Sequence, residues 1–314
     1  MKVFHLLPCL AAGLTLAACK DEGPTFVNNG PQAYVRIVNA SPDSPLVTAR
    51  FIDKVENLIS WDRLGYRGNS GNYVAVNAGS RSLRVFLAGQ GGNATTIDTA
   101  STVLLDTTGI VLQPQTYYTF VMTGRVLPQR GTAPNNARVL VFTDTLPAAG
   151  GIADTTLRIR AYHVAEGTGA VDVVLNKSVL IPADTTATPP RPAAVTIDSA
   201  VAATISNVAF GTRSAYATVT RVRPADTLNL YRTAVRTAGT TTNLISVRPN
   251  VIGQPFTAAT VSGSAQDPVA GVRQGRSVLS LFVFPAAVIG TPARTTATAV
   301  PTVDLIADQA PPRP

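Results

Sequence analysis

Short runs of alternating apolar and polar residues recur along most of this chain. Between residues 33 and 40, for example, Val35 and Ile37 lie on one side of an extended segment, and Arg36 and Val38 lie on the other. Such alternation, bounded by Gly, Pro, Asn and Ser, is typical of β-strands. Beyond the N-terminal segment no stretch has the i, i+3, i+4 apolar spacing of an amphipathic helix. The pattern predicts an all-β fold.

One pair of apolar runs occurs twice in the sequence. Residues 36–51 read RIVNASPDSPLVTARF and residues 160–175 read RAYHVAEGTGAVDVVL, at an offset of 124 (160 − 36 and 175 − 51). Each copy has an apolar run, a turn-rich break and a second apolar run, as in a β-arch or hairpin. The repeat predicts two copies of one domain.

Aromatic residues repeat after each copy. Tyr66 and Tyr73 enclose the sequence RGNSGN, Phe210 and Tyr216 enclose GTRSA, and an alternating strand follows in both places. Because these aromatic residues recur with the repeat, we expect them at core or seam positions.

Length and composition agree with two domains. At 314 residues the chain has room for about two domains of ordinary size. Apolar residues make up 45% and charged residues 14%, a mixture rich in strand and turn formers. The expected organisation is an N-terminal signal segment at 1–18, a flexible tether at 19–32, a first β-sandwich at 33–146, a linker at 147–156, a second β-sandwich at 157–308 with a proline-rich insertion at 182–194, and a proline-rich tail at 309–314.

Two late segments should complete the second domain. Residues 279–284 (LSLFVF) are expected to match the closing strand of the first domain at 139–142, and residues 300–307 to add one edge strand. The insertion is expected to be an exposed loop, because its prolines exclude a central strand.

The N-terminus has the layout of an export signal. One cation, Lys2, precedes an apolar run that ends at Leu16, and the whole is too short to span a membrane comfortably. Leu16, Ala17, Ala18 and Cys19 resemble the bacterial lipobox, in which cleavage after Ala18 leaves an acylated Cys19 as the first residue. The resemblance implies a lipid anchor in a membrane. The alternative is an ordinary signal peptide with a chance cysteine.

By resemblance to the enterobacterial sorting rule, Lys20 after the cysteine permits delivery to the outer membrane. We therefore expect a lipid-anchored protein of the cell envelope, at the outer membrane or the periplasmic face. The other cysteine is Cys9, so residues beyond Cys19 offer no disulfide, thiol nucleophile or cysteine-based metal site.

The formal net charge of +8 comes mostly from arginine. Basic surfaces attract polyanions, which at an envelope are lipid head groups, lipopolysaccharide or acidic polysaccharide rather than nucleic acid. No run of basic residues is present, and this favours scattered solubilising charge over a binding patch. The arginines of the first domain are Arg36, Arg50, Arg63, Arg67, Arg81, Arg84, Arg125, Arg130 and Arg138.

The string VRIVNASPDSP at 35–45 resembles a family of exported bacterial domains, catalogued as domain of unknown function 4397, whose members tend to read V-R-V-V-H-A-S-P-D-A-P-x-V-D-V. His163 and Asp172 of the second copy fall at the histidine and aspartate of this motif, where the first copy has Asn39 and Thr48. The resemblance covers about 33–145 and 157–290. It implies export and two tandem immunoglobulin-like antiparallel sandwiches, and it implies no activity.

His163 is the candidate for chemistry in this chain. It could act as a general base oriented by Asp172, or its ring could close the arch by hydrogen bonds, a job that Asn39 could do in the first copy. The exchange of histidine for asparagine favours the structural role for Asn39, His163 and Asp172. We expect no catalytic residues.

No metal or cofactor site is predicted. One histidine and an acylated cysteine cannot supply three zinc ligands of the usual kind, and Asp43, Asp53 and Asp62 lack the D-x-D-x-D spacing of a calcium loop. The glycines at 89–92 lack the strand and helix of a phosphate-binding loop.

Trp61 is the candidate ligand surface, since with Tyr66 and Tyr73 it could form a platform on which sugars stack. The favoured function is a non-catalytic structural or interaction module, anchored in the membrane by its N-terminal lipid and binding envelope polysaccharide or another surface protein. The alternative is a carbohydrate-binding or adhesion module, which requires an exposed Trp61. An enzyme would require His163 and Asp172 exposed together in a cleft.

Overall fold

The computed structural model describes residues 30–54, 60–88, 102–127, 136–148, 151–181, 183–186, 188–190, 195–220, 229–247, 275–288 and 300–309. In these ranges the regular elements are β-strands, and the predicted all-β, two-sandwich fold is confirmed. No membrane-spanning helix is found in this part of the chain. The predicted signal, Ala18, Cys19 and most of the tether lie outside the described residues.

The first half of the chain forms two four-stranded sheets. Sheet A has the order β4-β1-β7-β8, and sheet B has the order β3-β2-β5-β6. The strands are β1 (Gln32–Asn39), β2 (Val47–Phe51), β3 (Ser60–Leu64), β4 (Val74–Asn77), β5 (Gly79–Leu87), β6 (Val103–Leu112), β7 (Tyr117–Thr123) and β8 (Arg138–Asp144).

The second half repeats this plan strand for strand. Sheet C has the order β12-β9-β15-β16, and sheet D has the order β11-β10-β13-β14. Adding eight to each strand number of sheets A and B therefore gives sheets C and D. The strands are β9 (Thr156–His163), β10 (Val171–Ile181), β11 (Val195–Val208), β12 (Ala217–Thr220), β13 (Asn229–Thr237), β14 (Asn243–Val247), β15 (Val278–Phe284) and β16 (Thr302–Gln309).

Each half contains one parallel pair in an otherwise antiparallel sandwich. β1 runs parallel to β7, with Arg36 opposite Thr119, and β9 runs parallel to β15, with Arg160 opposite Ser280. Parallel neighbours need a long crossover, and the strands between them along the chain supply it. The first strand of each half therefore lies in the middle of its sheet.

Strand alternation fills a separate core inside each sandwich. Val35 and Ile37 of β1 point into the core between sheets A and B, as their spacing predicts. In the second half Leu157 and Ile159 of β9 point into the core between sheets C and D. Phe120 of β7 is fully buried in the first core, with its ring 6.0 Å from that of Phe51.

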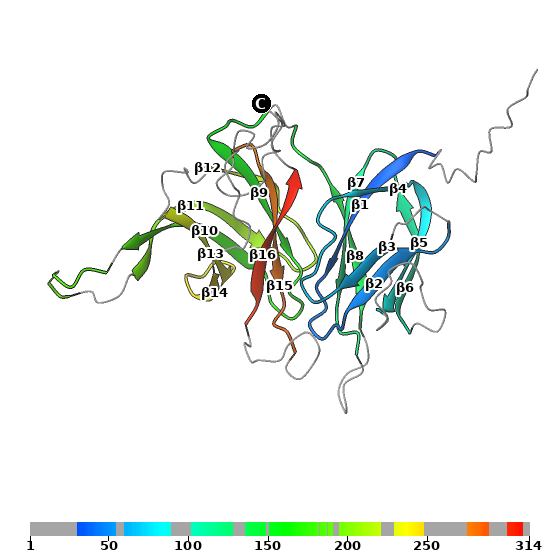
Figure 1. The fold of residues 1–314 in the computed structure, drawn as a ribbon, viewed down its shortest axis with the longest axis horizontal. Coiled ribbons are helices and arrows are strands. Elements are labelled where there is room, and N and C mark those ends of the chain that lie inside the picture. Colours follow the sequence, from blue (N-terminus) through cyan, green and yellow to red (C-terminus); the bar gives the residue numbers. More distant parts are fainter. Residues whose placement is uncertain are drawn as a thin grey trace, which may run out of the picture.

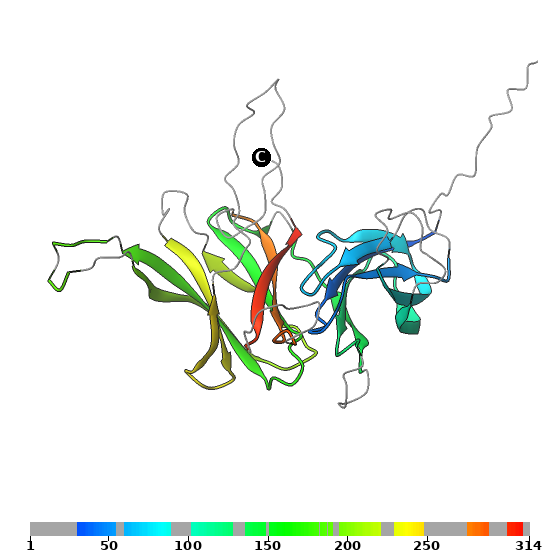
Figure 2. The same cartoon turned by 60° about the horizontal axis from the view of Figure 1, so that its bottom comes forward.

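Sheets A and C pack against each other through their outer faces, so the four sheets stack in the order B, A, C, D. A third apolar cluster lies between the halves. Figures 1 and 2 show β9, β15 and β16 of the second half beside the first half. The members of this cluster are Val38, Ala40, Val121, Phe142, Tyr162, Val164, Phe282, Phe284 and Ile306.

One of the two late strands differs from the sequence expectation. The segment at 279–284 forms β15, which is equivalent to β7 and not to the closing strand β8. The last strand, β16, is the equivalent of β8 and occupies an edge as expected. The error arises because β7 and β8 are both apolar, so composition does not distinguish them.

The proline-rich insertion lies at the tip of a long hairpin. β10 and β11 pair from Val171–Val208 to Ile181–Val195, and the hairpin extends away from the body (Figure 2). Ala183, Thr185 and Thr186 at the tip are exposed, in keeping with the predicted loop.

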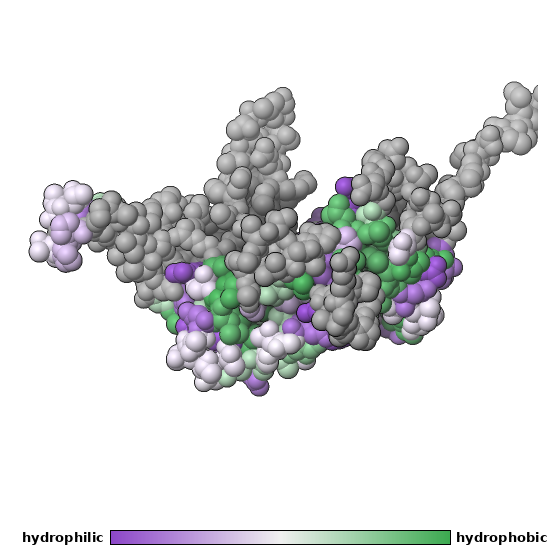
Figure 3. Space-filling view, turned by 90° about the horizontal axis from the view of Figure 1, so that it is seen from below, coloured by the Kyte–Doolittle hydropathy of each residue, from purple (hydrophilic) through white to green (hydrophobic). Residues whose placement is uncertain are grey.

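Seen from below, apolar areas of the described surface alternate with hydrophilic ones (Figure 3).

Replacing Phe120 by Ala should lower the free energy of unfolding by about 3–5 kcal/mol, because it leaves a cavity in the first core. The matched control is Val111→Ala, since Val111 is 59% exposed on β6, and it should change stability by less than about 0.5 kcal/mol. Urea unfolding followed by tryptophan fluorescence measures both. Equal effects would contradict the assignment of Phe120 to the core.

Candidate functional site

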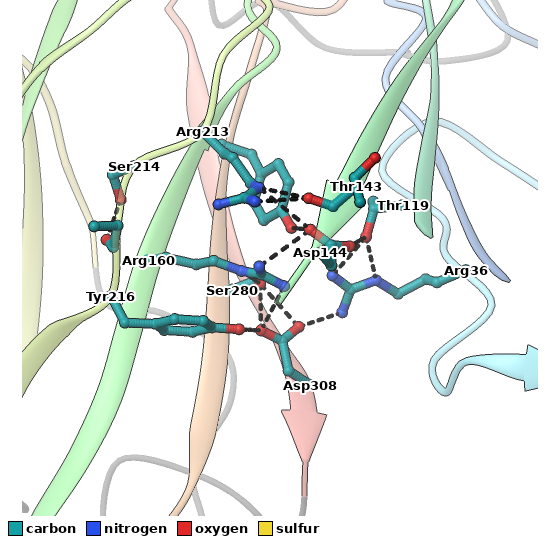
Figure 4. A network of polar contacts seen from close by, with 12 residues as sticks. Arg36, Thr119, Thr143, Asp144, Arg160, Arg213, Ser214, Tyr216, Ser280 and Asp308 are labelled. Atoms are coloured by element: carbon teal, nitrogen blue, oxygen red, sulfur yellow. Dashed lines mark hydrogen bonds and ion pairs between the residues drawn. The ribbon is translucent and has the colours of Figure 1, made fainter. Parts of the chain in front are cut away.

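Two arginines and two aspartates meet between sheets A and C (Figure 4). Arg36 of β1 and Asp144 of β8 come from the first half, and Arg160 of β9 and Asp308 of β16 come from the second. All four side chains have 0% exposure. We call these four residues the ionic network.

The arginines cross between the halves. Nη1 of Arg36 lies 2.6 Å from Oδ1 of Asp308, and Nη1 of Arg160 lies 3.1 Å from Oδ1 of Asp144. Nη2 of Arg160 also lies 3.1 Å from Oδ2 of Asp308 in its own half. Each aspartate thus lies at ion-pair distance from the arginine of the opposite half, and of these two reciprocal contacts only Arg36–Asp308 is also a hydrogen bond.

The strands position the arginines on the outer face of the sandwich. Arg36 and Arg160 occupy the same place in the two copies, at the offset of 124 residues. The parallel pairing puts a hydroxyl beside each. Oγ1 of Thr119 accepts a hydrogen bond from Nη2 of Arg36 at 3.0 Å, and Oγ of Ser280 accepts one from Nε of Arg160 at 2.9 Å.

Tyrosines donate to the carboxylates in the same repeated arrangement. Tyr73, just before β4, donates to Oδ2 of Asp144 at 2.9 Å. Tyr216, just before β12, donates to Oδ2 of Asp308 at 2.6 Å. Tyr162 of β9 donates across the interface to Oδ1 of Asp144. Each half therefore contributes an arginine, an aspartate, a tyrosine before its β4 or β12 and a small hydroxyl residue, and the second half adds Tyr162.

Burial fixes the charge state of these groups. Burial raises the pKa of the Tyr73, Tyr162 and Tyr216 hydroxyls, so all three stay protonated and act as donors. Burial alone would lower the pKa of Arg160, but Asp308 and other neighbours outweigh it and the pKa is raised. Guanidinium groups that stay cationic cannot transfer protons. The network is suited to holding the halves together and not to acid–base chemistry.

Arginine–aromatic contacts are repeated as well. Cζ of Arg36 lies 4.6 Å from the ring centroid of Tyr73, and Cζ of Arg160 lies 4.5 Å from that of Tyr216. A cation over an aromatic face contributes about 2 kcal/mol when it is desolvated. Each arginine is thus held by its own half while it pairs with the other.

Further ion pairs surround the network. Arg67 lies 2.5 Å from Asp304 of β16, and Arg138 of β8 lies 2.9 Å from Glu166 of the second half. In the other direction, Nη2 of Arg213 donates to the backbone oxygen of Thr143 at 2.6 Å. Pairs of this kind at a surface contribute little stability but fix the relative orientation of the halves.

Asn39 and His163 make one equivalent bond in the two arches, to residues 124 apart, and a second bond whose acceptors are not equivalent. Oδ1 of Asn39 accepts from the backbone N–H of Ser41 at 3.1 Å, and Nδ1 of His163 accepts from that of Ala165 at 3.3 Å. Nδ2 of Asn39 then donates to the oxygen of Leu64 at 3.1 Å, and Nε2 of His163 to that of Gly169 at 2.8 Å. Burial lowers the pKa of His163 and keeps the ring neutral.

The Asp172 carboxylate is bound by backbone N–H groups and not by His163. Its Oδ1 accepts from the backbone N–H of Asn207 at 2.7 Å, and its Oδ2 accepts from that of Gly239 at 2.9 Å. Because these bonds tie the carboxylate to the end of β11 and to the turn after β13, Asp172 does not orient His163. A paired histidine–aspartate base is not assembled.

The proposed ligand surface at Trp61 is wrong. Trp61 is only 5% exposed and packs in the first core, 5.8 Å from the ring of Phe51. It points inward because β3 pairs with β2 at Ala49. Tyr66 and Tyr73 lie instead at the seam between the halves, where Tyr66 packs on Phe284. No sugar-stacking platform can form from these three rings.

The last two predictions concern the lipidation site and metal binding. Ala18 and Cys19 lie outside the described residues. Within the residues that the structure describes, no group of three or more His, Cys, Asp or Glu side chains could hold a metal ion.

Sequence reasoning missed the ionic network because it treated arginine as surface charge. Arg36, Arg81 and Arg160 are fully buried. Arg81 pairs with Asp53 at 2.8 Å and lies over the ring of Phe51. The available signal was the presence of arginine at the same place in both copies, between apolar neighbours.

The comparison with protein families matches part of this chain. The model of the family described as Domain of unknown function (DUF4397) matches residues 33–174. The match spans the first half together with β9 and the beginning of β10. No curated protein matches the chain.

Solved structures give distant likenesses. A candidate cell adhesion protein from Bacteroides uniformis is 9% identical, with a TM-score of 0.20, over 88% of this chain and 97% of that one. The tip fimbrial protein Mfa3 from Porphyromonas gingivalis is 9% identical, with a TM-score of 0.19, over 88% of this chain and 100% of that one. TM-scores at this level carry no argument about function.

Replacing Arg36 by Met should lower the free energy of unfolding by about 3–5 kcal/mol, because it removes one partner of a buried ion pair. The matched control is Arg84→Met, since Arg84 and Asp106 are 34% and 38% exposed and such pairs contribute up to about 1 kcal/mol. Urea unfolding compares the two. A loss for Arg36→Met no larger than that of the control would show that the network does not hold the halves together.

His163→Asn should keep the fold and remove a pH dependence. Because the folded pKa is below the ordinary value of 6.5, the unfolded chain takes up the proton first, and wild-type stability falls as pH drops below that value. Unfolding at neutral pH and at a pH about one to two units below the ordinary histidine pKa should show a smaller loss for His163→Asn, whereas His163→Leu should lose about 1–3 kcal/mol at both. An equal pH response in wild type and His163→Asn would contradict the neutral buried ring.

Proposed function

We propose that this chain is a non-catalytic structural or interaction module, anchored at the cell envelope by a lipid on Cys19. The observation that carries the proposal is the reciprocal ionic network, with Arg36 paired to Asp308 and Arg160 to Asp144 in full burial. Buried charges are tolerated only in a fixed, well-matched geometry. The two sandwiches therefore behave as one rigid body.

The side chains best suited to catalysis are already used by the fold. Both ring nitrogens of His163 hold the arch, and both oxygens of Asp172 hold backbone turns. A general base needs a free nitrogen or oxygen within reach of a substrate. This supports a role without chemistry and without a cofactor.

The second half is proposed to be a second copy of the domain that the family model matches. Sheets C and D repeat the strand order of sheets A and B. The arch, the aromatic residues and the network residues recur at equivalent positions, although the match itself ends at residue 174. A duplicated domain with a shared interface gives a larger, stiffer unit than one sandwich alone.

The proposed location at the cell envelope is based on the N-terminal sequence. Leu16 to Cys19 resemble a lipobox after an apolar run of signal length, and acyl chains give stable anchoring when more than one is attached. The partners we propose are the membrane, through the lipid, and envelope polysaccharide or another surface protein. No nucleic acid is expected at this address.

Changing Cys19 to Ala should release the protein from the membrane fraction, because the acyl acceptor is lost. The matched control is Cys9→Ala, which removes the other cysteine and should leave the protein membrane-bound. Fractionation followed by intact-mass measurement of the mature N-terminus separates the two. A Cys19→Ala protein that stays with membranes, or a wild-type mature chain without acyl mass, would overturn the anchor.

The absence of catalysis is tested by the same His163→Asn chain. Activity screens of the wild-type protein and of this variant should give the same background rate, because no group of the protein acts on a substrate. A selective loss, with the fold intact by circular dichroism, would make His163 a catalytic residue and refute the proposal.

A further inference from the structure

We infer that the interface between the halves also fits a second copy of this chain. In that arrangement the first half of one chain docks on the second half of another and the reverse, giving a closed exchanged dimer. The inference goes beyond the proposed function and does not depend on the lipid anchor.

The interface has the reciprocity of a two-fold dimer. In a symmetric dimer, if residue i contacts residue j of the partner, then j contacts i. Arg36 and Arg160 are equivalent, as are Asp144 and Asp308, and the pairs are Arg36–Asp308 and Arg160–Asp144. The halves therefore recognise each other as two subunits would, although one chain carries both.

The contacts select the second half, and not another first half, as the partner. Tyr162 and Phe282 stack in the interface with their ring centroids 4.5 Å apart. The equivalent residues of the first half are Val38 and Val121, by the offset of 124 and by the shared register of β7 and β15. Two first halves would leave a gap where these rings belong.

The surrounding ion pairs impose the same choice. Asp304 of β16, which pairs with Arg67, is equivalent to Leu140 of β8 when Phe142 is aligned with Ile306 through the registers of β8 and β16. A first half facing another first half would place Arg67 against an apolar side chain. Only a first half and a second half satisfy both the charges and the rings.

An open chain would expose costly groups on both faces. Separation would uncover the third apolar cluster and leave four ionic groups without their partners across the interface. Any copy of the opposite half satisfies these groups equally well. The choice between closing within a chain and closing between chains is then made by the segment at 145–155, which joins β8 to β9.

A backbone hydrogen bond joins two residues of that segment. The backbone N–H of Gly151 donates to the oxygen of Ala148 at 3.0 Å. A tethered partner acts at an effective concentration on the order of millimolar, so a dilute chain closes on itself. Removing residues of this segment shortens the reach of the connection and favours exchange between chains, as shortened hinge loops do.

The test deletes residues 148–151 from the full chain in a Cys19→Ala background. We expect light scattering after size exclusion to give twice the monomer mass, and a monomer for the undeleted chain. The matched control deletes residues 183–186 from the exposed hairpin tip and should remain a monomer. A deleted chain that stays folded and monomeric would overturn the inference.

A charge exchange identifies the dimer interface. Arg67→Asp and Asp304→Arg are each placed in a separate deleted chain. In a mixture, the exchanged heterodimer restores one pair and keeps the other wild type, whereas both homodimers carry repulsion. Native mass spectrometry should show heterodimers above the statistical share of one half. A statistical mixture would assign the dimer to another surface and refute the inference.

If the deletion impairs folding, the same two substitutions in undeleted chains test for exchange between chains. The two variants are refolded together from urea at high and at low protein concentration. Heterodimers that appear only at high concentration are expected. Monomers alone at both concentrations would refute exchange.

Discussion

The rest of the structure depends on the exchange of buried charges between two sandwiches. Taking a guanidinium and a carboxylate out of water costs several kcal/mol per ion, and only close pairing with further hydrogen bonds offsets the cost. The first half does not contain this solution alone, since Arg36 relies on Asp308 and Asp144 receives Arg160, whereas the second half also pairs Arg160 with its own Asp308. Tyr73 and Tyr216 supply the remaining hydrogen bonds. Each sandwich has its own apolar core, but its buried arginine has an ion-pair partner in the other sandwich.

This dependence explains the character of sheets A and C. An ordinary sandwich exposes one face of each sheet to water, whereas β1 and β9 are buried on both faces along most of their length. Their inner faces carry aliphatic residues, and their outer faces carry arginine and tyrosine residues with matched partners. The strands keep an alternating sequence although neither face is solvated.

The sequence predicted the parts of the fold that are encoded locally. The repeat at 36–51 and 160–175 indicated two equivalent arches, and the alternation around Val35 assigned the two faces of β1 correctly. The network could not be predicted in this way, because Arg36 and Asp308 are separated by 272 residues and no local pattern connects them. Trp61 was misplaced for a similar reason, since its direction is set by the register of β3 on β2.

The order of the strands has a consequence for the order in which the molecule is completed. β1 emerges early but takes its place between β4 and β7, so the first sheet cannot close until β7 has followed. The ion-pair partner of Arg36, Asp308 on β16, is synthesised only at the end of the second half. A chain that lacks β16 carries Arg36 on an apolar face without Asp308, its closest carboxylate partner. The last strand that the structure describes therefore completes the ion pairing of the first.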